Sequence, residues 1–100
     1  MKTKSSPIEQ QLQQYTSSFY QALAQLNSAE QAKSFFNDLC SPAELQAMVD
    51  RWCAAIMLKQ GLTQREIASQ AGISVTTVSR VARCMANQSG GYQQLLEKIT

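Results

Sequence analysis

Histidine is absent from this chain of 100 residues, and glycine is scarce, at four residues. The chain therefore lacks the side chain that most often acts as a general acid or base near neutral pH. The sequence also contains no Gly-rich loop for phosphate. The seven carboxylates are scattered, and several stand where helix capping explains them. We therefore predict that the protein is not an enzyme and uses no cofactor.

Cysteine is also sparse. Cys40, Cys53 and Cys84 are odd in number, widely spaced and accompanied by no histidine. This arrangement fits neither a disulfide framework nor the ligand spacing of a zinc site. We interpret the three cysteines as reduced thiols and predict no metal site.

Long hydrophobic runs are missing. No stretch approaches the roughly 18 consecutive apolar residues of a membrane span, and the first residues lack the apolar core of a secretory signal. We expect a cytoplasmic protein with no membrane partner. A hydrophobic content of 44% can form one compact domain, but so short a chain buries a small fraction of its surface alone, which favours a dimer.

Positive charge is concentrated in the second half of the chain. The formal net charge is +2, but residues 1–50 carry three Lys or Arg against five Asp or Glu, whereas residues 51–100 carry six against two. A basic segment of this kind indicates contact with a polyanion such as nucleic acid.

Apolar residues recur every three or four positions from Ile8 to Leu26, which predicts an amphipathic first helix. Three capping boxes then predict three further helix starts, because each pairs a Ser or Thr with a Gln or Glu three positions later. Their residue pairs are Ser28 with Gln31, Ser41 with Glu44, and Thr63 with Glu66.

The remaining boundaries follow from glycine and serine. We expect Gly61 to end the long third helix and Ser74 to cap a fifth helix from Val75 to about Ala86. After a break at 87–91, the apolar spacing from Tyr92 to Ile99 predicts a sixth. The sequence thus predicts an all-α fold of six helices, without strands, in a single domain over residues 1–100.

Residues 63–86 have the pattern of a helix-turn-helix. Two short helices that cross at a steep angle need a small residue at the crossing and a turn that leaves the first helix, and Ala68 and Gly72 satisfy these needs. The apolar positions that we expect between the helices are Ile67, Ala71, Ile73, Val78 and Val81.

The polar positions of this motif are suited to duplex DNA. Arginine pairs with guanine or phosphate, hydroxyls bond base edges or phosphates, and small apolar groups contact the thymine methyl. We predict that Thr76, Thr77 and Ser79 reach bases or nearby phosphates and that the arginines mainly contact phosphate. The predicted DNA-binding residues are Gln64, Arg65, Ser74, Val75, Thr76, Thr77, Ser79, Arg80 and Arg83.

Over about residues 39–86 the chain resembles the Trp repressor superfamily. The resemblance is carried by Ser41-Pro42-x-Glu44, by Arg51, by the run from Gly61 to Ile67, and by Gly72 and Val78-Ser79-Arg80. The segments 35–40 and 79–84, together with Tyr92, make it most similar to the less characterised Trp-repressor-like branch of the YerC/YecD type.

The resemblance implies a homodimer in which the two chains interlock through helices at about 7–60 and 91–100. The strongly amphipathic first helix independently favours a partner subunit, although packing within the chain is the alternative. On this reading the protein is a transcriptional regulator, and more specifically a repressor, with double-stranded DNA as its partner.

The resemblance also implies a ligand pocket. Arg51 and Arg80 match the two arginines that enclose the indole in the tryptophan-responsive member. Val81 stands where that protein has glycine, and Cys84 where it has a ligand-contacting serine. We therefore do not expect tryptophan as the effector, and we expect Arg51 to form an ion pair, for example with Asp50 or Glu44.

Two alternatives to a simple DNA-binding regulator remain open. One is a regulator that responds to an unknown small molecule near Arg51 and Arg80. The other is a helical protein-interaction module that has lost DNA binding.

Overall fold

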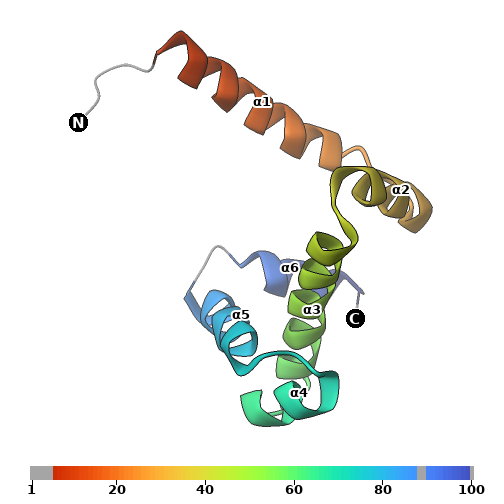
Figure 1. The fold of residues 1–100 in the computed structure, drawn as a ribbon, viewed down its shortest axis with the longest axis vertical. Helices are drawn as coiled ribbons and strands as arrows, with labels where there is room; N and C mark the ends of the chain where they lie inside the picture. The colour runs from red at the N-terminus through yellow and green to blue at the C-terminus, as the bar shows by residue number, and fades with distance from the viewer. Residues whose placement is uncertain (1–5, 88–89, 100) are drawn as a thin grey trace. The chain divides into compact units, whose positions relative to one another are not determined.

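The computed structural model describes residues 6–87 and 90–99. This part of the chain forms six α-helices and no strand, which confirms the all-α prediction (Figure 1). The helices are α1 (Pro7–Leu23), α2 (Ala29–Leu39), α3 (Pro42–Lys59), α4 (Gln64–Ala71), α5 (Val75–Asn87) and α6 (Gly91–Ile99). Gln88 and Ser89 of the predicted break, and Thr100, lie outside the described residues. Within the same residues, no helix has the length and apolarity that crossing a membrane would need.

The chain divides into two compact units, Met1–Leu39 and Cys40–Thr100. In the first unit, the ring centroid of Phe19 on α1 lies 6.4 Å from that of Phe35 on α2 and 5.6 Å from that of Tyr20. Neither α1 nor α2 contains a buried residue. The single domain expected from the sequence stays a prediction.

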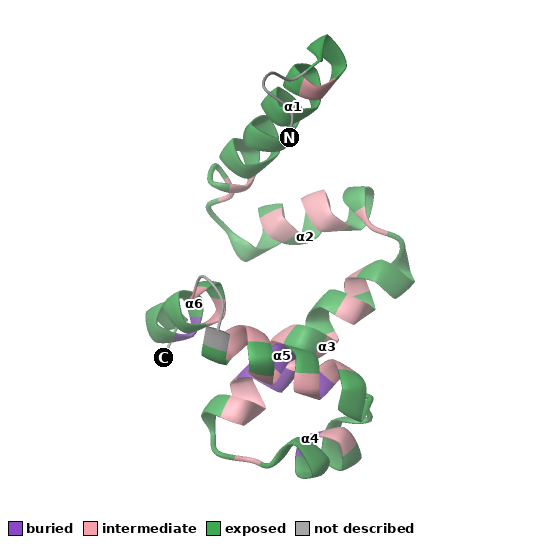
Figure 2. Ribbon diagram, turned by 90° about the vertical axis from the view of Figure 1, so that its left-hand side faces the viewer, coloured by how far each residue is buried: buried purple, intermediate pink, exposed green. Residues whose placement is uncertain are grey.

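The second unit has a buried apolar core to which α3, α4, α5 and α6 all contribute. Figure 2 colours the buried residues, which lie on these four helices and, for Ile73, in the turn between α4 and α5. The core consists of Ala54, Ala55, Ile67, Ile73, Val78, Val81 and Leu96. Ile67, Ile73, Val78 and Val81 are thus confirmed at the positions where the sequence predicts the interface of the helix-turn-helix.

Ala71 was expected in that interface but is exposed. It is the last residue of α4, directly before the residue where the chain leaves the helix, so its methyl group lies outside the buried contact. The first helix also ends earlier than expected, at Leu23, because the backbone N–H groups of Gln25 and Leu26 bond three residues back and tighten the chain into a turn.

Two of the predicted capping boxes are complete. In α3, the Glu44 backbone N donates to Ser41 Oγ at 3.2 Å and the Ser41 backbone N donates to Glu44 Oε1 at 2.8 Å. In α4, the Glu66 backbone N donates to Thr63 Oγ1 at 3.1 Å and the Thr63 backbone N donates to Glu66 Oε1 at 2.8 Å. These backbone hydrogen bonds lower the pKa of both glutamates, since they stabilise the ionised carboxylate.

The third predicted box, at the start of α2, differs in one bond. The Gln31 backbone N donates to Ser28 Oγ at 3.1 Å, as expected. The Gln31 side chain, however, accepts at Oε1 from the backbone N of Asn27, at 3.1 Å, and not from that of Ser28.

Glycines with positive φ end α3 and α4, as predicted. Gly61 has φ +93°, and the backbone N–H groups of Gly61 and Leu62 donate to the carbonyls of Leu58 and Met57 in a Schellman motif. Gly72 has φ +67° and donates from its backbone N to the carbonyl of Ala68. Each reversal sends the chain directly into the cap of the next helix.

We predict that Gly72→Ala lowers the free energy of unfolding by about 1 kcal/mol, because a side chain disfavours left-handed backbone. No atom lies within 4 Å of where the new methyl group would be, so the cost is conformational. Gly91→Ala is the matched control, since Gly91 also has open space but opens α6 without a positive φ. Urea unfolding of both variants measures the difference, and equal stabilities would contradict this account of the turn.

We predict that replacing Glu66 by glutamine destabilises the protein at neutral pH and much less in acid. The pKa of this carboxyl is lower in the folded protein than in the unfolded chain, so its charge stabilises the fold above about pH 4.3. That contribution is lost as the pH falls through the lowered pKa of the folded state. Thermal unfolding of both proteins across this range tests the sign, and a difference that does not change with pH would refute it.

Candidate nucleic-acid interface

The motif begins at the capped start of α4 and turns at Gly72 into a second cap at Ser74. The Thr77 backbone N donates to Ser74 Oγ at 3.1 Å, and Ser74 Oγ donates to Thr77 Oγ1 at 2.9 Å. The Ser74 hydroxyl thereby satisfies an N–H at the start of α5 and also orients the Thr77 side chain. Both caps hold helix N-termini, which carry partial positive charge and favour phosphate.

Helix α5 is held by one apolar side. Val78 is fully buried and Val81 is 1% exposed, and both belong to the core cluster that includes Ile67 of α4 and Ile73 of the turn. This packing sets the angle between α4 and α5 and leaves the opposite side of α5 free of the core. The polar residues predicted to contact DNA lie outside that cluster.

Seven of the nine predicted DNA-binding residues are exposed and two are half-buried. Val75, the first residue of α5, is 53% exposed. Thr77 and Ser79 are the half-buried pair. The exposed residues are Gln64, Arg65, Ser74, Val75, Thr76, Arg80 and Arg83.

A hydrogen bond that the sequence did not reveal connects the two helices. Ser79 Oγ on α5 donates to Gln64 Oε1 on α4 at 2.6 Å. The two residues are 15 positions apart, and no sequence motif that we used pairs them. Only the crossing angle of α4 and α5 brings them together.

The exposed polar side chains of α4 and α5 carry three guanidinium groups against one carboxylate. Arg65, Arg80 and Arg83 are exposed. The one acidic residue of α4 and α5, Glu66, is engaged at its Oε1 with the Thr63 backbone N. The arrangement therefore presents hydrogen-bond donors and positive charge, the chemistry that phosphate and guanine attract.

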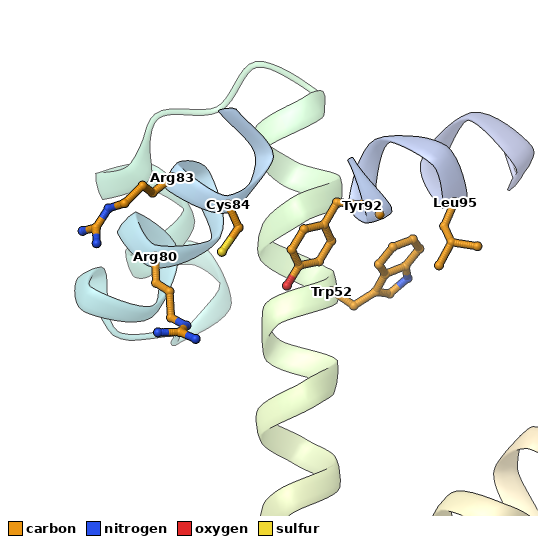
Figure 3. A pocket seen from close by; sticks show the side chains of 7 residues that line it. Trp52, Arg80, Arg83, Cys84, Tyr92 and Leu95 are labelled. Carbon is orange, nitrogen blue, oxygen red and sulfur yellow. The ribbon is translucent and has the colours of Figure 1, made fainter. Parts of the chain in front are cut away.

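A cavity of about 580 Å³ lies beside α5, within the size range of small-molecule sites. Arg80, Arg83 and Cys84 of α5, Gly91, Tyr92 and Leu95 of α6, and Trp52 of α3 line it. Figure 3 shows these side chains projecting from the three helices. The rings of Trp52 and Tyr92 are stacked, with centroids 6.4 Å apart and planes at 19°.

The cavity contains two of the four residues predicted for a ligand pocket. Arg80 and Cys84 line it, whereas Arg51 is exposed and is not among the lining residues, and Val81 is buried in the core. The ion pair expected for Arg51 does not form within the part of the chain that the structure describes. Glu44 instead caps α3, and Asp50 accepts at 2.8 Å from Gln46 Nε2.

Trp52, Tyr92 and Leu95 line the cavity although the sequence analysis assigned none of them to a pocket. Periodicity places each on the apolar side of its own helix, but it does not say that two such sides meet beside Cys84. No sequence motif that we used pairs these helices.

Comparison with known proteins gives consistent matches. The family model described as Trp repressor protein matches residues 13–100. The uncharacterized protein YerC of Bacillus subtilis is 32% identical over 80 residues, which cover 80% of this chain and 77% of YerC. Two crystal structures are also similar in fold and sequence.

A Trp repressor candidate from Staphylococcus aureus superposes with a TM-score of 0.82 at 32% identity, covering 95% of each chain. A TrpR-like protein from Eubacterium eligens gives a TM-score of 0.80 at 31% identity, covering 86% of this chain and 89% of the other. These matches confirm the predicted superfamily and its YerC-type branch. The chain belongs to the Trp repressor family, a family of DNA-binding transcription regulators and not of enzymes.

Proposed function

We propose that the protein represses transcription as a homodimer that binds a specific duplex sequence. The observation that carries the proposal is the exposed polar side of α4 and α5, which the buried contacts of Val78 and Val81 leave outside the core. In this mechanism, the N-terminal part of α5 from each subunit enters a major groove, with half-sites about one helical turn apart.

The roles of the individual residues follow from their exposure. Val75 and Thr76 stand at the exposed start of α5, where their methyl groups can contact thymine and the Thr76 hydroxyl a base edge. Arg65, Arg80 and Arg83 reach phosphates on either side of the groove. Thr77 is half-buried and oriented by Ser74, so it contacts DNA with a fixed hydroxyl.

Exposed apolar side chains support the homodimer. In the first unit, α1 exposes Ile8, Leu12, Tyr15 and Tyr20, with Ile8 at 69%. In the second unit, a further set remains exposed, namely Met48, Val49, Leu95 and Ile99. Exposed apolar side chains in such number are typical of an interface, and the proposed occupant is a second copy of the chain.

A second candidate function, regulation by a small molecule, is favoured by the cavity beside α5. Its lining combines the stacked rings of Trp52 and Tyr92 with two arginines, Arg80 and Arg83, whose side chains could turn toward a small aromatic carboxylate. A panel of such compounds, including tryptophan, can be added to the protein–DNA complex. Altered affinity with one of them supports this function, and unchanged affinity throughout argues against it.

We predict that Arg83→Ala weakens binding to all duplexes alike and lowers the slope of log affinity against log salt by about one, because one phosphate contact is lost. Lys33→Ala, which removes a charge from α2 outside the motif, is the control and should leave the slope intact. Fluorescence anisotropy titrations at several salt concentrations measure both. An unchanged slope for Arg83→Ala would remove this residue from the interface.

We predict that Thr77→Ala changes the preferred sequence more than it changes affinity for unrelated duplexes, because its hydroxyl is proposed to contact a base or an adjacent phosphate. Competition between single-base variants of a bound duplex measures the preference. If Thr77→Ala weakens binding to all of these duplexes equally, Thr77 contributes only to the cap of α5.

We predict that Leu12→Asp shifts the protein from dimer to monomer, because a charge would be buried in the proposed interface. Gln14→Asp, at another exposed position of α1, is the control and should leave the dimer intact. Sedimentation velocity measures the assembly, and circular dichroism verifies that both variants remain helical. A wild-type protein that sediments as a monomer would refute the dimer.

A further inference from the structure

The hydrogen bond between Ser79 and Gln64 assigns different roles to the two residues. Ser79 Oγ lies 2.6 Å from Gln64 Oε1 and donates its only proton there. Ser79 is half-buried, whereas Gln64 is exposed as the first residue of α4. The bond therefore runs from the side of α5 nearer the core to a side chain at the surface.

This bond determines what Gln64 presents to solvent. The carboxamide oxygen is occupied by Ser79, and the Nε2 group, with two protons to donate, is on the other branch of the same planar group. No other hydrogen bond of the Gln64 side chain is described. The bond turns Oε1 toward Ser79 on α5 and restricts rotation about the terminal bond, so that Nε2 is the group that Gln64 presents away from α5.

DNA offers acceptors that match such a donor. Phosphate oxygens accept at every step, and the major groove adds N7 of the purines, O6 of guanine and O4 of thymine. Cytosine presents an amino donor in the groove, which an amide oxygen would have to meet. Because Oε1 is turned toward Ser79 on α5, it is poorly placed for that contact.

We infer that Ser79 is a positioning residue that acts on DNA through Gln64: it holds the Gln64 carboxamide so that Nε2 donates to an acceptor on DNA. The inference rests on the proposed DNA binding and changes the role that the sequence suggests for Ser79, which was direct contact with a base or phosphate. Ser79 then influences affinity and base preference without touching DNA.

The test is a double-mutant cycle in DNA affinity, using the duplex that the wild-type protein selects from a random pool. Ser79→Ala and Gln64→Ala should each weaken binding about three- to tenfold, the effect of one hydrogen bond. The double variant should bind no more weakly than Gln64→Ala alone, because both substitutions remove the same hydrogen bond from Gln64 to DNA. Thr76→Ala combined with Gln64→Ala is the control, and these two effects should multiply.

Two further variants separate positioning from a general effect on stability. Ser79→Thr retains the hydroxyl and should restore binding. Gln64→Glu keeps an acceptor for Ser79 but removes the donor, so it should weaken binding at least as much as Gln64→Ala. Unfolding curves verify that every variant is folded at the assay temperature, and a loss that follows unfolding rather than this pattern overturns the inference.

The outcomes distinguish the inference from the function on which it rests. Effects of Ser79→Ala and Gln64→Ala that multiply would show direct contact by Ser79 and overturn the inference alone. A wild-type protein that binds no duplex would overturn both. If the variants lose affinity equally for every duplex, the DNA group that accepts from Gln64 Nε2 is a phosphate. If the loss of affinity is confined to one base pair, that group is a base edge. Either result supports the inference.

Discussion

Helix α5 depends on a close approach to α3. At the core, α3 contributes Ala54 and Ala55, which are both fully buried, and α5 contributes the short branched side chains of Val78 and Val81. Small residues on one helix allow the backbone of the other to come near, and β-branched side chains fill the remaining space in few rotamers. Because the interior is densely packed, a larger residue at either alanine would displace α5.

The rest of the motif follows from this contact. Ile67 of α4 and Ile73 of the turn join the same core, so α4 is oriented relative to α5 by the residues that hold α5 on α3. The exposed side of α5 is therefore rigidly placed, as groove reading requires. The bond between Ser79 and Gln64 forms only because that angle is maintained.

Features that depend on residues three or four positions apart could be predicted from the sequence. The caps at Ser41, Thr63 and Ser74 and the reversals at Gly61 and Gly72 are of this kind, because local chemistry decides them. What the sequence did not reveal depends on packing between helices. The Ser79–Gln64 bond joins two helices and the cavity joins three, and Ala71 was misplaced because a pattern of apolar residues does not say where a contact ends.

Arg80 and Arg83 connect the two candidate functions. Both are exposed on α5, where the proposal assigns them to phosphates, and both line the cavity beside α6. A ligand that drew either guanidinium into the cavity would remove positive charge from the DNA-facing surface. Regulation by an effector is thus compatible with the DNA-binding mechanism and would act through the same side chains.

The most direct test of the central claim is selection from a random pool of duplex DNA by the purified protein, at two salt concentrations. The account predicts an enriched palindrome with half-sites about one helical turn apart and weaker retention at the higher salt. Enrichment of no sequence, with retention that does not respond to salt, would contradict groove reading by α5 and favour a helical module that binds protein instead.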